Sequence, residues 1–158
     1  MAKLSKTYIF PEVSLKVTIV LLTHHRLELI KLCLESINNQ KIHNLDIEII
    51  ALLNGVDDDS EKHLQRFAEK NSQFKFLNIK DSLPVGEARN KVINEAKGEY
   101  LCFIDDDVEI SDNYFQEAET IIESNISWDV FGGPDRNKEK SSDFQKVLSE
   151  IMQSFFSM

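Results

Sequence analysis

Short apolar runs that alternate with amphipathic segments are the feature that most constrains the fold of this chain. Three continuous apolar runs and one run of alternating apolar and polar residues predict four strands, at residues 17–22, 47–53, 74–79 and 100–104. Between and after these runs, apolar residues recur at steps of three and four, which predicts helices. We therefore expect an α/β fold: a doubly wound, mostly parallel sheet with helices on both faces.

The ends of the predicted helices are marked by particular residues. Gly98 follows one helix and is the residue type favoured just after a helix end, while Ser111 or Asp112 is expected to cap another. The helices are predicted at 27–37, around 64–68, at 86–97 and from 111 or 112 to about 124. Residues 128–131 are predicted to form a further strand, which Gly132, Gly133 and Pro134 end.

The C-terminal part of the sequence differs in character from what precedes it. Residues 136–143 are almost wholly polar and predict a loop, and a strongly apolar helical face follows from Phe144 to Phe155. We therefore expect an α/β domain at 1–135 and a loop with an amphipathic helix at 136–158. The apolar face is expected to dock back on its own domain, or to pack against a further segment or a partner subunit in a homo-oligomer.

The charge balance limits the partners of this chain. It has 18 Lys and Arg against 27 Asp and Glu, a formal net charge of −9, which disfavours binding to nucleic acid or to an anionic membrane surface. No run approaches the roughly 18 apolar residues of a membrane span. The N-terminus lacks the apolar core of a secretory signal, and Cys33 and Cys102 lie in apolar stretches as expected for buried free thiols. These observations predict a cytoplasmic protein.

Three aspartates after the fourth predicted strand are the strongest chemical signal. Because side chains alternate along a strand, we expect Asp105 and Asp107 to point to one side and Asp106 to the other. Two carboxylates on one side repel each other unless a cation compensates them, so Asp105 and Asp107 are predicted to hold Mg²⁺ or Mn²⁺. Such a metal keeps water ligands and bridges to substrate phosphates.

Other site chemistries fail on spacing. An EF-hand loop that began at Asp105 would need Gly and Glu where the chain has Ile110 and Gln116. The four histidines lack the spacing of a zinc site, and no phosphate-binding glycine loop or serine nucleophile elbow is present. The acidic run 57–59 is interpreted as a helix cap with Ser60.

Arg89 is the second residue of interest, because it lies in the first turns of a predicted helix. A guanidinium and free backbone N–H groups could both face an anion there. The alternative is a surface arginine that pairs with Glu87 or Glu95.

Four segments together resemble the family 2 glycosyltransferases of GT-A fold, over nearly the whole chain. They are VTIVLLTHHR, ALLNGVDDDS, PVGEARNKVINEAKGEYLCFIDDDVEI and FGGPD. The resemblance implies transfer of a sugar from a nucleotide-diphosphate sugar to an acceptor hydroxyl, with inversion and with metal assistance. It also implies nucleotide-sugar contacts by residues of the first, second and fourth strand ends, of one helix and of a glycine pair: Thr23, His24, Asn54, Arg89, Asp105, Asp106, Gly132 and Gly133.

Two departures from the family pattern affect the expected function. Leu53–Asn54 and His24–His25 stand where members usually have Asp-Asp and Tyr-Asn, so a UDP-sugar is expected only as the family default. Inverting members take their catalytic base from an acceptor-binding half that follows the GGP segment, and the chain ends about one helix later. We therefore expect the acceptor half to be absent, and no catalytic base is assigned; the acceptor is unknown.

Two other functional classes share features with this sequence. A non-catalytic nucleotide-sugar or metal-binding module, or a subunit of a split enzyme, would share the same cavity but not turn over an acceptor. A phosphorylation-receiving domain is disfavoured, because such domains place paired acids after the first strand, where this chain has Thr23–His24–His25.

Overall fold

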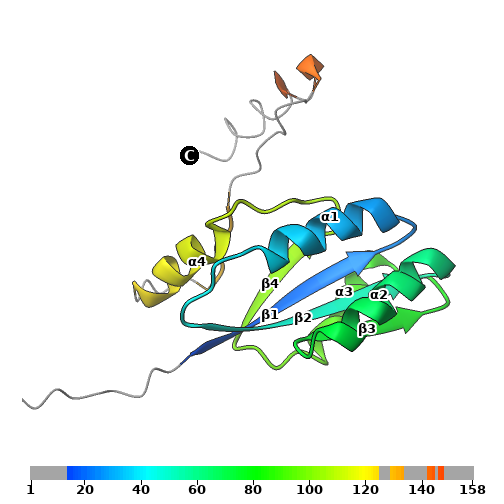
Figure 1. Cartoon of the computed structure of the whole chain (residues 1–158), viewed down its shortest axis with the longest axis horizontal. Coiled ribbons are helices and arrows are strands. Elements are labelled where there is room, and N and C mark those ends of the chain that lie inside the picture. The colour runs from blue at the N-terminus through cyan, green and yellow to red at the C-terminus, as the bar shows by residue number, and fades with distance from the viewer. Residues whose placement is uncertain (1–13, 125–128, 134–141, 145, 148–158) are drawn as a thin grey trace, which may run out of the picture. The chain divides into compact units, whose positions relative to one another are not determined.

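The structure is a computed structural model that describes residues 14–124, 129–133, 142–144 and 146–147. The chain divides into two compact units, residues 1–124 and 125–158. The described residues of the first unit form four strands and four helices (Figure 1). In chain order they are β1 (Leu15–Thr23), α1 (Leu27–Asn38), β2 (Leu45–Asn54), α2 (Asp58–Lys70), β3 (Phe74–Ile79), α3 (Val85–Ile93), β4 (Tyr100–Asp105) and α4 (Tyr114–Glu123).

The four strands form one parallel sheet in the order β3-β2-β1-β4. Strand β1 pairs with β2 on one side and with β4 on the other. The order reverses between β1 and β4, and the carboxyl ends of β1, β2 and β4 surround this switch point. The predicted α/β class, the parallel pairing and the four strand positions are confirmed.

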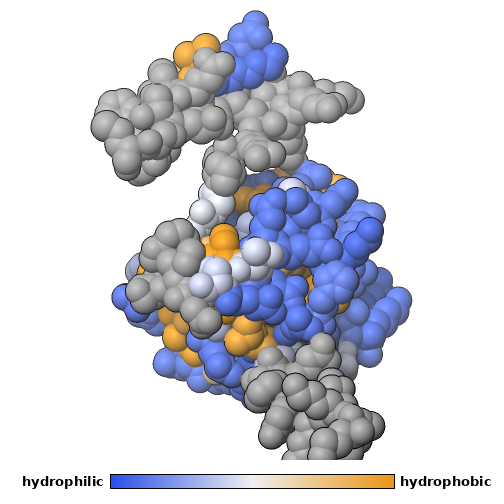
Figure 2. Space-filling view, turned by 90° about the vertical axis from the view of Figure 1, so that its left-hand side faces the viewer, coloured by the Kyte–Doolittle hydropathy of each residue, from blue (hydrophilic) through white to orange (hydrophobic). Residues whose placement is uncertain are grey.

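Helices cover both faces of the sheet. On one face of the sheet, every second residue of β1 and β2 packs with α1, α2 and α4 in a large apolar cluster, which includes Val17 and Ile47. The opposite residues, such as Val20 and Ile50, pack with Ala88 and Val92 of α3. Figure 1 shows α1 and α2 in front of the sheet and α3 behind it. The end of the sheet at which the strands begin faces the viewer in Figure 2, where the coloured surface is mostly hydrophilic with small separate hydrophobic areas.

The third helix ends earlier than predicted. Helix α3 stops at Ile93, not at Lys97, and the chain turns through Asn94 and Glu95. The backbone N–H groups of Lys97 and Gly98 then donate to strand side chains, Glu48 and Thr18, and not to helical carbonyls. Gly98 is thus not a helix-end residue: a Cβ at this position would lie 2.4 Å from the Thr18 nitrogen, so the glycine permits close packing.

Three further local predictions can be compared with the structure. Helix α4 begins at Tyr114 after Asn113, and neither Ser111 nor Asp112 caps it. The strand predicted at 128–131 is wrong for Asp129–Phe131, which have no strand structure; Trp128 lies outside the described residues. The capping role of the acidic run 57–59 is confirmed, because the Asp57 carboxylate accepts hydrogen bonds from the backbone N–H groups of Asp59 and Ser60.

The structure agrees with the predictions for the two cysteines and for the start of the C-terminal helix. Cys33 is fully buried and Cys102 half-buried, and both thiols are free, as predicted. The described residues 143–144 and 146–147 are helical, in agreement with the start of the predicted C-terminal helix, and Phe144 is 75% exposed. The remainder of the predicted apolar face lies outside the described residues.

Candidate functional site at the carboxyl edge of the sheet

A cavity of about 460 Å³ lies at the carboxyl ends of β1, β2 and β4, next to the switch point of the strand order. Ligands of doubly wound sheets bind at this position. The cavity brings together seven of the residues predicted from the sequence, along with five that the sequence analysis did not single out. The predicted residues are Thr23, His24, Asn54, Arg89, Asp105, Asp106 and Asp107, and the others are Leu22, Arg26, Ser82, Leu83 and Val85.

Exposure alternates across the three aspartates: the Asp105 and Asp107 side chains are 64% and 50% exposed, and that of Asp106 is 6% exposed. Strand β4 ends at Asp105, and Asp106 and Asp107 form a turn. All three residues line the cavity, and one guanidinium nitrogen contacts both Asp106 and Asp107. Asp106 is also the buried member: it is 4% exposed and accepts a 2.7 Å hydrogen bond from the Thr23 hydroxyl.

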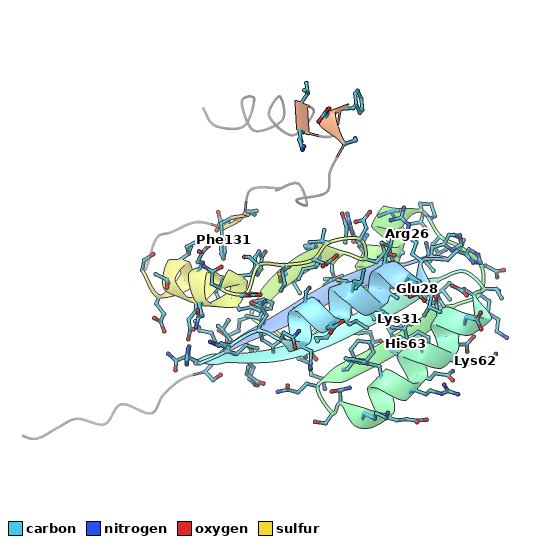
Figure 3. The ribbon with its side chains drawn as sticks, turned by 45° about the horizontal axis from the view of Figure 1, so that its top comes forward. Arg26, Glu28, Lys31, Lys62, His63 and Phe131 are labelled. Atoms are coloured by element: carbon cyan, nitrogen blue, oxygen red, sulfur yellow. The ribbon has the colours of Figure 1, made fainter. Side chains whose placement is uncertain are left out.

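Arg26 is the residue that sequence reasoning missed. Its Nη1 donates to Asp106 Oδ1 and to Asp107 Oδ2, each at 3.1 Å. Arg26 precedes the first residue of α1 and lies at the end of the sheet to which the strand arrows point (Figure 1 and Figure 3). The sequence did offer a signal for Arg26: it lies shortly after the end of the first strand, β1. A cation there can face the acidic turn at the end of β4, which is the parallel neighbour of β1.

Arg89 faces the cavity from α3. Its Nη2 donates to Asp105 Oδ1 at 2.7 Å, and its guanidinium lies 5.8 Å from the centre of the Phe103 ring. The alternative pairing with Glu87 or Glu95 is wrong: the ion pair of Arg89 among the described residues is with Asp105, and Glu95 pairs with Lys75. The Arg89 and Asp105 side chains are 37% and 64% exposed, so this pair remains open to solvent and to a ligand.

The opposite wall of the cavity is built by a pair of polar residues at the ends of β1 and β2. His24 Nδ1 lies 2.5 Å from the carbonyl oxygen of Asn54. Gly55, at φ +120°, makes room for the imidazole: a Cβ there would lie 2.7 Å from His24 Nδ1. The Asn54 side chain is 5% exposed and bonds to the backbone of Leu83, which fixes the loop that leads into α3.

The fit of a divalent cation can be judged from the donors on this edge. Within the described ranges, no three His, Cys, Asp or Glu side chains gather as a complete metal shell. The Asp105 and Asp107 side chains are each at least half exposed. Asp105 contacts Arg89 through Oδ1, and Asp107 contacts Arg26 through Oδ2. Hard carboxylate oxygens of this kind suit Mg²⁺ or Mn²⁺, which commonly complete their shells with water and substrate phosphates. The residues therefore fit a metal that arrives with a phosphorylated ligand.

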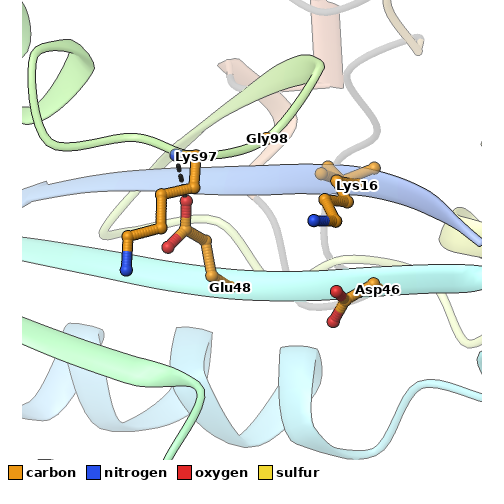
Figure 4. A pocket seen from close by; sticks show the side chains of 6 residues that line it. Lys16, Asp46, Glu48, Lys97 and Gly98 are labelled. Atoms are coloured by element: carbon orange, nitrogen blue, oxygen red, sulfur yellow. Dashed lines mark hydrogen bonds between the residues drawn. The ribbon is translucent and has the colours of Figure 1, made fainter.

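A smaller cavity of about 130 Å³ lies near the opposite end of the sheet (Figure 4). Lys16, Asp46, Glu48 and Lys97 line it. Burial alone would raise the pKa of Glu48, but hydrogen bonds from Thr18 and from the Lys97 backbone outweigh burial and hold that pKa below its ordinary value. Because Glu48 ties the segment before β4 to β2, we interpret these charges as part of the fold.

The predicted glycine pair belongs to the second unit. Gly132 and Gly133 are exposed and have no regular secondary structure. A Cβ at Gly132 would meet nothing within 4 Å. Their predicted approach to a donor sugar stays a prediction. No helix in the part of the chain that the structure describes is both long and apolar enough to cross a membrane.

Comparisons with known proteins give the family. Residues 18–156 match the sequence profile described as Glycosyl transferase family 2. EpsH of Bacillus subtilis, which is named as a glycosyltransferase, is 36% identical over 88 residues, which are 56% of this chain and 25% of EpsH. The chain thus spans about a quarter of the length of this relative.

Solved structures show the same fold. S. aureus TarS 1–349 in complex with UDP superposes with a TM-score of 0.63 at 20% identity, over 70% of this chain and 32% of TarS 1–349. The mannosyltransferase PcManGT from Pyrobaculum calidifontis, in complex with GDP-Man and Mn²⁺, gives 0.55 at 21% identity, over 65% and 31% of the two chains. These similarities show that the chain shares the α/β fold of both proteins. The chain belongs to glycosyltransferase family 2, as its sequence motifs predicted.

Proposed function

We propose that this chain binds a nucleotide-diphosphate sugar together with Mg²⁺ or Mn²⁺ and forms the donor-binding part of an inverting glycosyltransferase. One observation carries the proposal. The carboxylates of residues 105–107, at the end of β4 and in the turn that follows, meet the guanidinium groups of Arg26, before α1, and Arg89, in α3, around one cavity at the switch point of the sheet. The similarity to TarS, solved with UDP, and to PcManGT, solved with GDP-Man and Mn²⁺, supports it.

Asp107 and Asp105 are the proposed metal ligands. Both side chains are exposed at the rim of the cavity, whereas both oxygens of Asp106 are already used by Thr23 and Arg26. Two carboxylates leave room for phosphate oxygens and water in the metal shell. A bound divalent cation would supply neutralisation of the charge that develops on the departing diphosphate.

Arg89 and the start of α3 are proposed to contact the anionic part of the donor. The first N–H groups of a helix have no intrahelical acceptor and carry the positive end of the helix dipole. Val85, at the start of α3, lines the cavity, and the Arg89 guanidinium lies one turn further along the same helix. Binding of a phosphate oxygen there would replace the exposed contact between Arg89 and Asp105.

Thr23, His24 and Asn54 are proposed to form the part of the cavity that receives the nucleoside. Asn54 acts there mainly through Leu83, since its amide is committed to the backbone of that residue. The His24 ring, held through Nδ1, presents its other edge to a ligand. UDP is the nucleotide we propose, in line with the family default and with the TarS complex.

The proposed reaction is a single displacement. An acceptor hydroxyl oxygen forms a bond to the anomeric carbon, the bond from that carbon to the diphosphate oxygen breaks, and the electron pair leaves with the diphosphate. The hydroxyl proton passes to a carboxylate base that we do not place among the described cavity residues. Attack opposite the leaving group inverts the anomeric configuration.

Titration calorimetry with UDP, GDP and ADP, each with Mn²⁺ and with a chelator, tests the binding proposal. We expect UDP to bind only with Mn²⁺, and Arg89→Ala to weaken that binding about 10- to 100-fold, as loss of a charge-assisted contact predicts. Lys75→Ala is the matched control, because Lys75 also forms a half-exposed ion pair but lies outside the cavity lining. Equal UDP binding in chelator, or equal losses in both variants, would contradict the proposal.

Turnover separates an enzyme from a binding module. A panel of hydroxyl acceptors with UDP-sugars, monitored for released UDP and for glycosylated product, is the direct assay. Acceptor-dependent product of inverted configuration supports the enzyme. Tight metal-dependent UDP binding without any product would instead favour a non-catalytic module or a subunit that needs a second chain.

A further inference from the structure

Arg26 places a permanent cation inside the acidic turn. Its Nη1 contacts Asp106 and Asp107 at 3.1 Å each. Arginine guanidinium groups stay protonated in proteins, so these contacts partly neutralise the turn before any metal arrives.

The two contacts of Arg26 differ in how easily they can be exchanged. The Asp106 side chain is 6% exposed and also accepts from Thr23, so it anchors the guanidinium. The Asp107 side chain is 50% exposed, as is that of Arg26. Exposed ion pairs contribute little to stability, because water competes for both partners. A ligand at the rim can therefore release Asp107 while Asp106 keeps Arg26 in place.

We propose that Arg26 is a positioning residue that makes divalent metal binding at Asp107 conditional on the nucleotide diphosphate, an inference that rests on the proposed metal-dependent nucleotide binding. A metal ion at Asp107 would lie close to a guanidinium that Asp106 holds nearby. The two like charges repel. A diphosphate brings negative charge to the same place and offsets that repulsion, so metal and nucleotide bind together and the free metal binds weakly.

Manganese titrations followed by electron paramagnetic resonance test this role without measuring catalysis. The wild type is expected to bind Mn²⁺ weakly alone and much more tightly with UDP. Arg26→Gln should bind Mn²⁺ alone about three- to tenfold more tightly, the range expected for removing one exposed charge contact. We expect the affinity for Mn²⁺ in the presence of UDP to stay close to that of the wild type. UDP should therefore strengthen Mn²⁺ binding to Arg26→Gln by a correspondingly smaller factor, and Mn²⁺ should strengthen UDP binding by that same smaller factor.

Two variants control for loss of charge and for general effects. Arg26→Lys keeps the positive charge and should retain weak binding of Mn²⁺ alone. Lys31→Gln removes a cation of α1 that pairs with Glu28 and does not line the cavity, and it should match the wild type. Unchanged coupling in Arg26→Gln, or tighter binding of Mn²⁺ alone in Arg26→Lys as well, would overturn the proposal.

A measurement on the wild type covers the case in which Arg26→Gln fails to fold. The side-chain Nε–H resonance of Arg26 should be unmoved by Mg²⁺ alone and should shift when Mg²⁺ and UDP are added together. A full shift with Mg²⁺ alone would overturn the role of Arg26. If wild-type UDP binding proves independent of metal, both the metal requirement of the proposed function and this inference are contradicted. If UDP binding depends on metal but the coupling in Arg26→Gln is unaltered, only this inference is contradicted.

Discussion

Asn54 and Leu83 form a reciprocal pair of hydrogen bonds: Asn54 Nδ2 donates to the Leu83 carbonyl at 2.8 Å, and the Leu83 N–H donates to Asn54 Oδ1 at 2.9 Å. The side chain at the end of β2 thus mimics a neighbouring strand and holds the loop that leads into α3. This loop contributes Ser82 and Leu83 to the cavity wall.

Loss of this pair should loosen the cavity wall. Asn54→Ala leaves two partly buried backbone groups of Leu83 without these partners, so we expect the free energy of unfolding to fall by about 1–3 kcal/mol. Hydrogen exchange should accelerate at the amides of Ser82 and Leu83, and UDP affinity should fall about tenfold. Asn78→Ala, at an exposed position of β3, serves as the control and should change none of these. Unaltered exchange at the amides of Ser82 and Leu83 would contradict the account of Asn54.

Asp106 and Asp107 should behave in opposite ways on substitution. Asp106→Asn removes the charge that holds Arg26 inside a buried contact, and it should lower the free energy of unfolding by about 1–3 kcal/mol. Asp107→Asn acts on an exposed pair, so we expect a loss of stability below about 1 kcal/mol together with loss of Mn²⁺-dependent UDP binding. Thermal melts and calorimetry on both variants give the comparison. Equal effects in both measurements would remove the distinction between an anchor and a metal ligand.

Asp57 should make part of the stability depend on pH. A hydrogen bond from the Ser60 hydroxyl, supported by backbone N–H groups, lowers the pKa of Asp57 against the opposing effect of burial. A carboxyl whose pKa is lower in the folded than in the unfolded state stabilises the fold above its unfolded value, about 3.9, and this contribution is lost as pH falls through the folded pKa.

The variant Asp57→Ala should therefore unfold about 1 kcal/mol more easily than wild type at pH 7, with a difference that shrinks below about pH 4. Chemical denaturation at pH 7, 5 and 3 measures it. Asp59→Ala, at the exposed neighbouring position, should be nearly neutral throughout. A constant difference for Asp57→Ala across this range would show that its charge has no part in capping α2.

The sequence predicted the fold well because its signal is local and repeated. The runs 17–22, 47–53 and 100–104 had no competing interpretation as helices, and parallel pairing followed from the helices between them. The site was predicted to the extent that it consists of strand ends: Thr23, Asn54 and Asp105 were placed on one edge because parallel strands end on the same side.

The remaining features depend on contacts between distant segments. The contacts of buried Asp106 are with Thr23 and Arg26, some 80 residues away. The early end of α3 follows from the bonds that Glu48 and Thr18 of two strands make with Lys97 and Gly98. No pattern within a short window reports such partners.

The close packing at Gly98 can be tested against a second glycine. Gly98→Ala would place a Cβ 2.4 Å from the Thr18 nitrogen, so the backbone must shift, and we expect a loss of about 1–3 kcal/mol in unfolding free energy. Gly86→Ala meets no atom within 4 Å and lies in the first turn of α3, where alanine should be neutral or stabilise by up to about 1 kcal/mol. Similar melting temperatures for the two variants would contradict the packing described for Gly98.

The most direct test of the central claim is to locate the bound nucleotide on the protein. Backbone ¹H–¹⁵N spectra recorded as UDP is added in the presence of Mg²⁺ should show shifts at residues 22–26, 54–55, 82–83, 85–89 and 105–107, which surround the larger cavity. Lys16, Glu48 and Lys97, around the smaller cavity, should stay unchanged. Shifts confined to the smaller cavity, or no shifts at millimolar UDP and Mg²⁺, would contradict the account.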